Sequence, residues 1–328
     1  MKPVYPWILC AGLGLLGAAC NGDSDGGKGQ LVEARAVGVD VGNPFDATPT
    51  PTADAVYFTA MNVETGGVLY KIGTAAGSTP TMVASGFVAP TSLVMSTSGD
   101  TVYVSDLGLR GENSPEAADK PAGAVYSVPA GGGDPSLLAA TDGYGPRSLD
   151  LVSISTIGDV LYFTGVNPTS GAAGVYRMPL PSGELEVIYE GPDLREPSGV
   201  AVTGDGEVYV IDTIGADAGA ALVKVGDGAV TVVTPGLLVG YPAGIALTQD
   251  EGFMLVSGIK AEVGSAQVYR IDLADPSLDN AEIIDAGISQ NTESAGLHRA
   301  HAVDNYAWSN ADARGTVYLL GTKAKALP

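Results

Sequence analysis

The chain has 328 residues, of which 16 are basic and 37 acidic, so its formal net charge is −21. This charge argues against nucleic acid or an anionic lipid surface as a partner, because both are bound through basic patches. The hydrophobic fraction of 45% excludes a disordered chain, and 46 glycines with 21 prolines favour strands and turns over helices.

The first residues are typical of an export signal. Lys2 precedes an apolar run over 7–16 that is too short to span a bilayer comfortably, and small residues stand before Cys20. This end resembles a bacterial lipobox, although Gly17 stands where that motif usually has leucine. The resemblance implies a signal peptide over 1–19 and lipidation of Cys20; an ordinary cleaved signal is the alternative.

Residues 20–30 follow as a polar, glycine-rich segment, which is typical of a flexible tether between an anchor and a folded domain. Both cysteines, Cys10 and Cys20, precede the tether's end, so the mature domain has no thiol for a disulfide or a metal. Asn21 after the cysteine is compatible with sorting to an outer membrane. The expected location is therefore the cell envelope, with membrane attachment through the lipid.

One unit recurs along the rest of the chain. A strand of alternating β-branched and aromatic residues ends in a small polar residue, and a second strand follows after a variable loop. The first strands read AVYFT (55–59), TVYVS (101–105), VLYFT (160–164), EVYVI (207–211), FMLVS (253–257) and NYAWS (305–309). Their central residues are 46 to 59 positions apart, a spacing typical of four-stranded propeller blades.

Proline-led inner strands and short apolar outer strands complete these units, which predicts one all-β domain over 31–328, a six-bladed β-propeller with four antiparallel strands per blade. The sixth unit has no fourth strand of its own, whereas the segment QLVEARAVGV (30–39) has no other assignment. We therefore predict that this N-terminal segment is the outer strand of the last blade, beside 316–320.

The segment PSGVAVTGDGEVYVIDT (197–213) resembles propellers of the NHL-repeat and gluconolactonase-like groups. The gluconolactonase-like enzymes hold a divalent cation, usually calcium, at the channel mouth through an Asn or Asp directly after the start of an inner strand and a Glu near the N-terminus. Aligned on the inner-strand proline, this chain has at that place Phe45, Thr91, Arg147, Ser198, Ala243 and Arg299. None is Asn or Asp, so calcium remains a possible cofactor only, with Asp46 the nearest carboxylate.

Two arginines at this position suggest a different site. Guanidinium groups suit carboxylate or phosphate, so Arg147, Arg299 and one histidine predict an anion-recognising mouth. The candidate ligand-binding residues are Arg147, Arg299, His298, Glu196 and Asp46.

The two histidines of the chain, His298 and His301, fall on a predicted inner strand. Residues three apart on a strand point to opposite faces, so we expect one histidine at the channel edge, one between blades, and no shared metal. Asp106 and Asp212 end equivalent strands, where an Asp commonly caps a turn through backbone amides. Calcium ligation by these two carboxylates is the alternative.

The sequence favours a lipid-anchored binding or interaction module that takes a protein or a small anionic ligand at its loop face. No G-x-S-x-G, H-E-x-x-H or P-loop motif supports catalysis. The largest loop, 107–123, is either a partner-binding element or a solvated insertion. A metal-dependent lactonase- or esterase-like hydrolase acting at the channel mouth is the alternative, and an envelope scaffold is a third.

Overall fold

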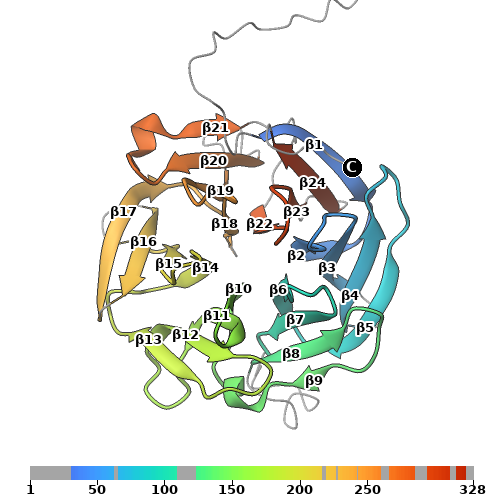
Figure 1. The fold of residues 1–328 in the computed structure, drawn as a ribbon, viewed down its shortest axis with the longest axis horizontal. Helices are drawn as coiled ribbons and strands as arrows, with labels where there is room; N and C mark the ends of the chain where they lie inside the picture. Colours follow the sequence, from blue (N-terminus) through green and yellow to red (C-terminus); the bar gives the residue numbers. More distant parts are fainter. Residues whose placement is uncertain are drawn as a thin grey trace, which may run out of the picture.

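The structure is a computed structural model that describes residues 31–62, 66–108, 123–215, 219–226, 228–241, 243–259, 266–284, 294–310 and 315–322. These residues form six four-stranded antiparallel sheets around a central axis (Figure 1), which confirms the predicted six-bladed propeller. The predicted signal peptide, Cys20 and the tether lie outside the described residues, as do residues 109–122 of the long loop. Within the described ranges, no helix is long and apolar enough to cross a membrane.

Each blade contributes one strand to the wall of the channel. The inner strands are β2 (Asn43–Pro49), β6 (Pro90–Met95), β10 (Ser148–Ile154), β14 (Pro197–Val202), β18 (Ile245–Leu247) and β22 (Ser294–Arg299). The second strands are β3 (Ala55–Asn62), β7 (Thr101–Asp106), β11 (Gly158–Val166), β15 (Val208–Asp212), β19 (Phe253–Ile259) and β23 (Tyr306–Asn310).

The third and outer strands continue each blade toward the rim. The third strands are β4 (Gly66–Gly73), β8 (Ala124–Pro129), β12 (Ala173–Pro179), β16 (Ala220–Gly226), β20 (Ala266–Asp272) and β24 (Thr316–Thr322). The outer strands are β5 (Thr81–Phe87), β9 (Ser136–Leu137), β13 (Glu186–Glu190), β17 (Ala229–Leu237), β21 (Glu282–Ile284) and β1 (Leu31–Val39). Two short 3-10 helices, η2 (Ala139–Thr141) and η3 (Leu278–Asn280), accompany the outer strands.

The N-terminal strand closes the ring, as predicted. β1 pairs antiparallel with β24, with Val39 opposite Thr316 and Ala34 opposite Leu320. Figure 1 shows the two strands side by side at the rim of the last blade. Because this blade takes strands from both ends of the described chain, its sheet is complete only after the N-terminal segment has paired.

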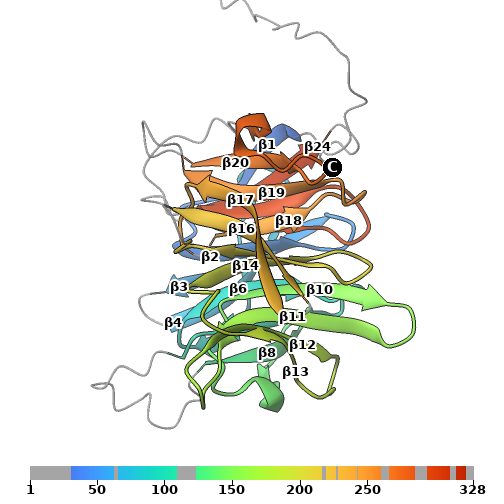
Figure 2. The ribbon, with the colours of Figure 1, turned by 90° about the vertical axis from the view of Figure 1, so that its left-hand side faces the viewer.

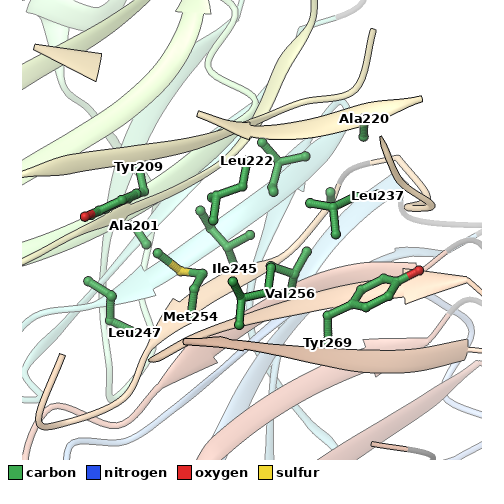
Figure 3. Packing of buried hydrophobic residues seen from close by; sticks show 13 residues of the cluster. Ala201, Tyr209, Ala220, Leu222, Leu237, Ile245, Leu247, Met254, Val256 and Tyr269 are labelled. Atoms are coloured by element: carbon green, nitrogen blue, oxygen red, sulfur yellow. The ribbon is translucent and has the colours of Figure 1, made fainter. Parts of the chain in front are cut away.

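The core lies between neighbouring blades rather than within one. In the cluster between the fourth and fifth blades, Leu222 and Ile211 of one blade meet Ile245, Met254 and Val256 of the next (Figure 3). Burial of a side chain of this size contributes about 1.5–3 kcal/mol relative to its exposure. Each sheet is therefore stabilised by the two sheets that flank it.

The inner strands all run in the same direction along the channel, so its two ends differ. At one end, here called the strand-start end, the chain enters the inner strands from the outer strands of the preceding blades. At the other, the hairpin end, the inner strands turn into the second strands of their own blades. Figure 2, at right angles to Figure 1, shows the hairpin between β10 and β11 projecting from that face.

Candidate functional site

Strand register identifies a ring of equivalent positions along the channel. Opposite the central residues of the second strands lie Thr48, Val94, Asp150, Ala201, Ala246 and His298. Two members of this ring can carry charge, Asp150 in the third blade and His298 in the sixth. These blades are three positions apart in a ring of six, so the two residues occupy opposite walls of the channel.

Polar side chains of the inner strands also bridge neighbouring blades. Each inner strand has an edge that pairs with no other strand, and its amides need acceptors. The Ser92 hydroxyl accepts from Leu149 N at 3.1 Å. Ser148 accepts from Val200 N at 3.3 Å in the same way. These bonds fix the spacing of consecutive blades at the channel wall.

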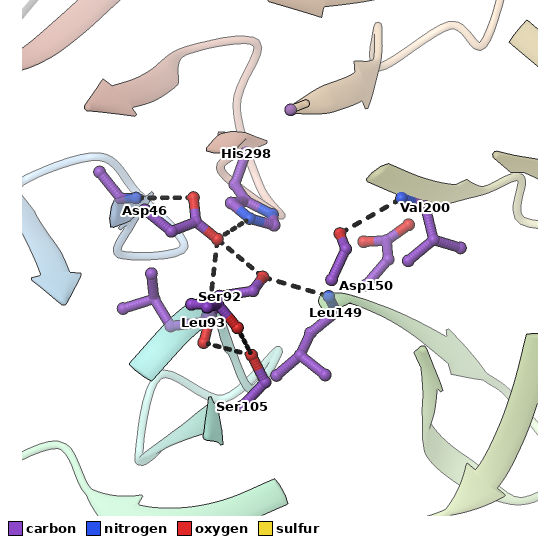
Figure 4. Close-up of polar contacts among 12 residues, drawn as sticks. Asp46, Ser92, Leu93, Ser105, Leu149, Asp150, Val200 and His298 are labelled. Carbon is purple, nitrogen blue, oxygen red and sulfur yellow. Dashed lines mark hydrogen bonds and ion pairs between the residues drawn. The ribbon is translucent and has the colours of Figure 1, made fainter. Parts of the chain in front are cut away.

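Asp46 is the centre of the most extensive of these networks (Figure 4). Its Oδ2 accepts from Ser92 Oγ at 2.7 Å and from Leu93 N at 3.0 Å, both in the next blade. The same oxygen lies 2.8 Å from His298 Nε2, which belongs to the last blade. One carboxylate, only 1% exposed, thus joins the first, second and sixth blades where the ring closes.

A glycine makes room for this carboxylate. A Cβ added at Gly296 would lie 1.7 Å from Asp46 Oδ1, far inside any contact distance. Gly296 is two residues before His298 in β22, so its side of the strand faces Asp46. Any larger residue here would displace the carboxylate from its partners.

A cavity of about 240 Å³ lies at the hairpin end of the channel. Its polar lining comes from the inner-ring pair Asp150 and His298, from their neighbours Ser153 and Arg299, and from the turns beyond the strands, which supply Thr97, Gly204, Glu251 and His301. Its apolar lining comes from the inner strands: Val94, Leu151, Val152, Val202, Ile245, Ala246 and Leu247. The cavity thus combines charged groups with an aliphatic wall.

His298 presents one ring nitrogen to Asp46 and leaves the other available. Asp46 Oδ2 is an acceptor in each of its bonds, so Nε2 of His298 carries the hydrogen. The second nitrogen, Nδ1, has no hydrogen-bond partner among the described residues. Burial alone would lower the pKa of His298, but the charge and hydrogen bond of Asp46, with the charge of Asp150, outweigh it and raise that pKa.

Asp150 is the charged group facing His298 across the channel. Its Oδ1 accepts from Leu151 N at 2.8 Å and its Oδ2 from Val202 N at 2.7 Å. Burial raises the pKa of this carboxyl, an effect that the two amides and the histidines only partly offset. Its charge is therefore costly in the absence of a closer positive group.

His301 lines the same cavity as His298, which differs from the prediction. β22 ends at Arg299, so the alternation of a strand does not extend to His301. Its Nε2 donates to the Met95 carbonyl at 2.7 Å, which leaves Nδ1 as its second polar atom. In the described part of the chain, no group of three or more His, Cys, Asp or Glu side chains is placed to hold a metal ion.

The predicted pairing of Arg147 with Arg299 at one mouth is wrong. Arg147 directly precedes β10, at the strand-start end, whereas Arg299 is the last residue of β22, at the hairpin end. In blade six, Ser294 lies opposite Asn310. The equivalent pairs in other blades are Pro197 with Asp212 and Pro90 with Asp106, so Ser294 takes the place of the inner-strand proline. The sequence-based alignment placed His298 at the proline position, which is four residues too far along the chain.

Arg147 and Glu196 do meet, at the strand-start end. Arg147 Nη1 lies 3.8 Å from Glu196 Oε1, and the guanidinium lies 5.9 Å from the centre of the Tyr241 ring. The two side chains are 22% and 35% exposed, so solvent screens this pair. Arg147 is thus already paired within the protein.

Asp106 and Asp212 occupy equivalent places, and their carboxylates cap the loops that enter the inner strands. Asp106 accepts from the amides of Val88 and Ala89 at 2.7 and 2.8 Å. Asp212 accepts from those of Arg195 and Glu196 at 2.9 and 2.8 Å. These are the turn-capping roles expected for an Asp at a strand end.

Sequence reasoning overlooked Asp150 and Ser92 as parts of the site. A signal was present for Asp150, since its segment PRSLDL has an acidic residue where equivalent inner strands have Val94 or Ala201. Ser92 gave no such signal, because small polar residues are common in these strands. Its partner Asp46 was a candidate, but for the mouth rather than for a bond to His298.

Comparisons with known proteins indicate a fold and no family. No family model matches the chain, and no curated protein matches its sequence. Among solved structures, a gluconolactonase from Xanthomonas campestris is 14% identical with a TM-score of 0.56 over 90% of this chain and 87% of its own. The PQQ-bound aldose sugar dehydrogenase of Streptomyces coelicolor is 12% identical with a TM-score of 0.58 over 88% and 97%.

A third similar structure is TolB from Acinetobacter baumannii, 10% identical with a TM-score of 0.51 over 86% of this chain and 54% of that one. The likeness is one of fold. Two of the three are named as enzymes with different activities, and one propeller architecture supports many functions.

Proposed function

We propose that this protein is a lipid-anchored cell-envelope propeller that binds a small molecule in the cavity at the hairpin end of its channel. The anchor is supported by the sequence before residue 31 alone. The binding role is supported by the cavity itself, which is lined by Asp150, His298 and His301 and by aliphatic residues of the inner strands. The Nδ1 atoms of the two histidines have no hydrogen-bond partner among the described residues. Polar groups that converge on a cavity beside aliphatic side chains are typical of a ligand site.

The experiment is a ligand-observed NMR screen of a mixed small-molecule library against the protein and an Ala246→Phe variant. Ala246 lines the cavity and also packs in the buried cluster between the fifth and sixth blades, so a phenyl group there reduces the space, and the fold of the variant is checked by circular dichroism before binding is compared. We expect compounds that bind the protein to lose that binding in the variant. An Ala139→Phe variant, changed at an exposed position outside the cavity, serves as the control. Equal binding to all three proteins would refute the cavity as the site.

A hydrolase remains the second candidate because of one observation. The Asp46–His298 hydrogen bond of 2.8 Å is the arrangement in which a carboxylate orients a histidine that acts as a base. In this alternative His298 would activate water against an ester or lactone in the cavity. Turnover of such a substrate that disappears in His298→Gln would favour it over simple binding.

A further inference from the structure

We infer that the ligand of the hairpin-end cavity is a small organic cation, a protonated amine on a short aliphatic body, held between Asp150 and the two histidines. The inference rests on the proposed function of the cavity as a binding site. It concerns the hairpin end of the channel. The sequence resemblance points instead to the strand-start end.

The polar atoms that Asp150, His298 and His301 leave over beside the cavity are acceptors, whereas Arg299, which also lines it, offers donors. Asp150 receives two backbone amides, one on each oxygen, and each oxygen retains a second lone pair. His298 and His301 both use Nε2 as a donor, to Asp46 and to the Met95 carbonyl. Their Nδ1 atoms therefore accept when the rings are neutral, and His298 is 93% buried beside the cavity. Three acceptors without protein donors match the three hydrogens of an ammonium group.

The charges point to the same class of ligand. Asp150 has no ion pair among the described residues, and burial works against its charge. Glu251 adds a second carboxylate at the rim, bound to Gly204 N at 2.7 Å. Arg299 also lines the cavity, and its Nη1 donates to the Ala300 and His301 carbonyls at 2.9 and 3.5 Å, so one positive charge stands beside the two carboxylates. A cation entering the cavity would also be drawn by the net charge of −21.

The rest of the lining selects an organic cation over a metal ion. Val94, Ile245 and Leu247 offer aliphatic surface next to the charged groups. The volume of about 240 Å³ is room for about eight water molecules at roughly 30 Å³ each, which suits a body the size of a six-membered ring. No metal-holding group of side chains occurs in the described ranges.

The test compares three probes with one shape and different charge: cyclohexylammonium, cyclohexanol and cyclohexanecarboxylate, measured by isothermal titration calorimetry on the intact protein. We expect the ammonium compound to bind about tenfold more tightly than the alcohol, and the carboxylate to bind most weakly. Asp150→Asn should weaken the ammonium compound about tenfold and leave the alcohol unchanged. The matched control Asp134→Asn removes the same charge at an exposed position and should change neither.

A pH series gives a second readout. His298 faces Asp46 from β2 and Asp150 from β10, and Asp150 also faces His301. Protonation of His298 turns its Nδ1 acceptor into a donor. The affinity for cyclohexylammonium, which stays protonated below about pH 10, should therefore rise with pH over the range above the ordinary histidine pKa of about 6.5, because the pKa of His298 is raised and its proton is lost there. A flat or falling affinity in this range would contradict the assigned ligand class.

The outcomes separate the two proposals. If the alcohol or the carboxylate binds as tightly as the ammonium compound, and Ala246→Phe removes that binding, the cavity is a ligand site but the cation is wrong. If Asp150→Asn leaves the affinity for the ammonium compound unchanged, the cation is likewise wrong. The proposed function itself is wrong if library compounds bind the Ala246→Phe variant as tightly as they bind the unaltered protein.

Discussion

At the strand-start end of the channel, several charged side chains are paired with one another or with the backbone, namely Arg147 with Glu196, and Asp106 and Asp212 with loop amides, although the buried Asn310 side chain has no hydrogen-bond partner among the described residues. At the hairpin end, Asp150 and the Nδ1 atoms of the histidines remain available to a cavity. Asp106, Asp212 and Asp150 all accept backbone amides, but Asp150 also lines a cavity, together with two histidines whose Nδ1 atoms have no partner among the described residues. The comparison distinguishes polar side chains that stabilise the fold from polar side chains that are candidates for binding a ligand.

The largest expected effect comes from Gly296→Ala. The added methyl group would occupy the place of Asp46 Oδ1 and separate the carboxylate from His298 and Ser92. Loss of a buried charged pair with overpacking should lower the free energy of unfolding by about 3–5 kcal/mol, measured by urea denaturation. Gly226→Ala, at an open position in β16, should change it by less than about 0.5 kcal/mol. Equal stability of the two variants would contradict the role given to Asp46.

An intermediate effect is expected at the other end, for Asp106→Ala. Three amides lose their acceptor, those of Val88, Ala89 and Gly108. Water can reach part of this loop, so we expect a loss of about 2–3 kcal/mol in the free energy of unfolding. The affinity of the cavity for its probes should not change. A weaker probe affinity would mean that the two ends are coupled.

The smallest effect is expected for Arg147→Ala. Its pair with Glu196 spans 3.8 Å and is partly exposed, so its loss should cost less than about 1 kcal/mol in denaturant titrations. A double-mutant cycle with Glu196→Ala measures the coupling directly. A coupling above about 2 kcal/mol would place Arg147 in a tighter network than its distance implies.

Much of the architecture could be predicted from the chain because it depends on local repetition. Alternation of β-branched and aromatic residues, repeated with turns between, indicated the strands and their number. The unassigned segment before the first unit indicated the closing strand, and its pairing with β24 confirms this. The capping by Asp106 was predictable for the same reason, since it involves residues close in sequence.

The register of the sixth blade was harder to predict. It lacks the proline that marks the inner strand in other blades, and a β-bulge lies between Ser294 and Leu297. Without that marker, the sequence pattern places Arg299 at the strand-start end. Only the pairing of β22 with β23 shows where each residue of β22 lies along the channel axis.

The sequence by itself therefore determined the repeat and the number of blades, since each unit is a pattern of a few dozen residues. It also determined the closure of the ring, since the last unit lacks the outer strand that the unassigned N-terminal segment supplies. The tertiary structure alone decided that His298 meets Asp46, 252 residues earlier in the chain, and that Asp150 faces them. The reason is geometric. Inner strands of different blades do not pair, so no ladder register links them, and only the closed ring brings their side chains to one point.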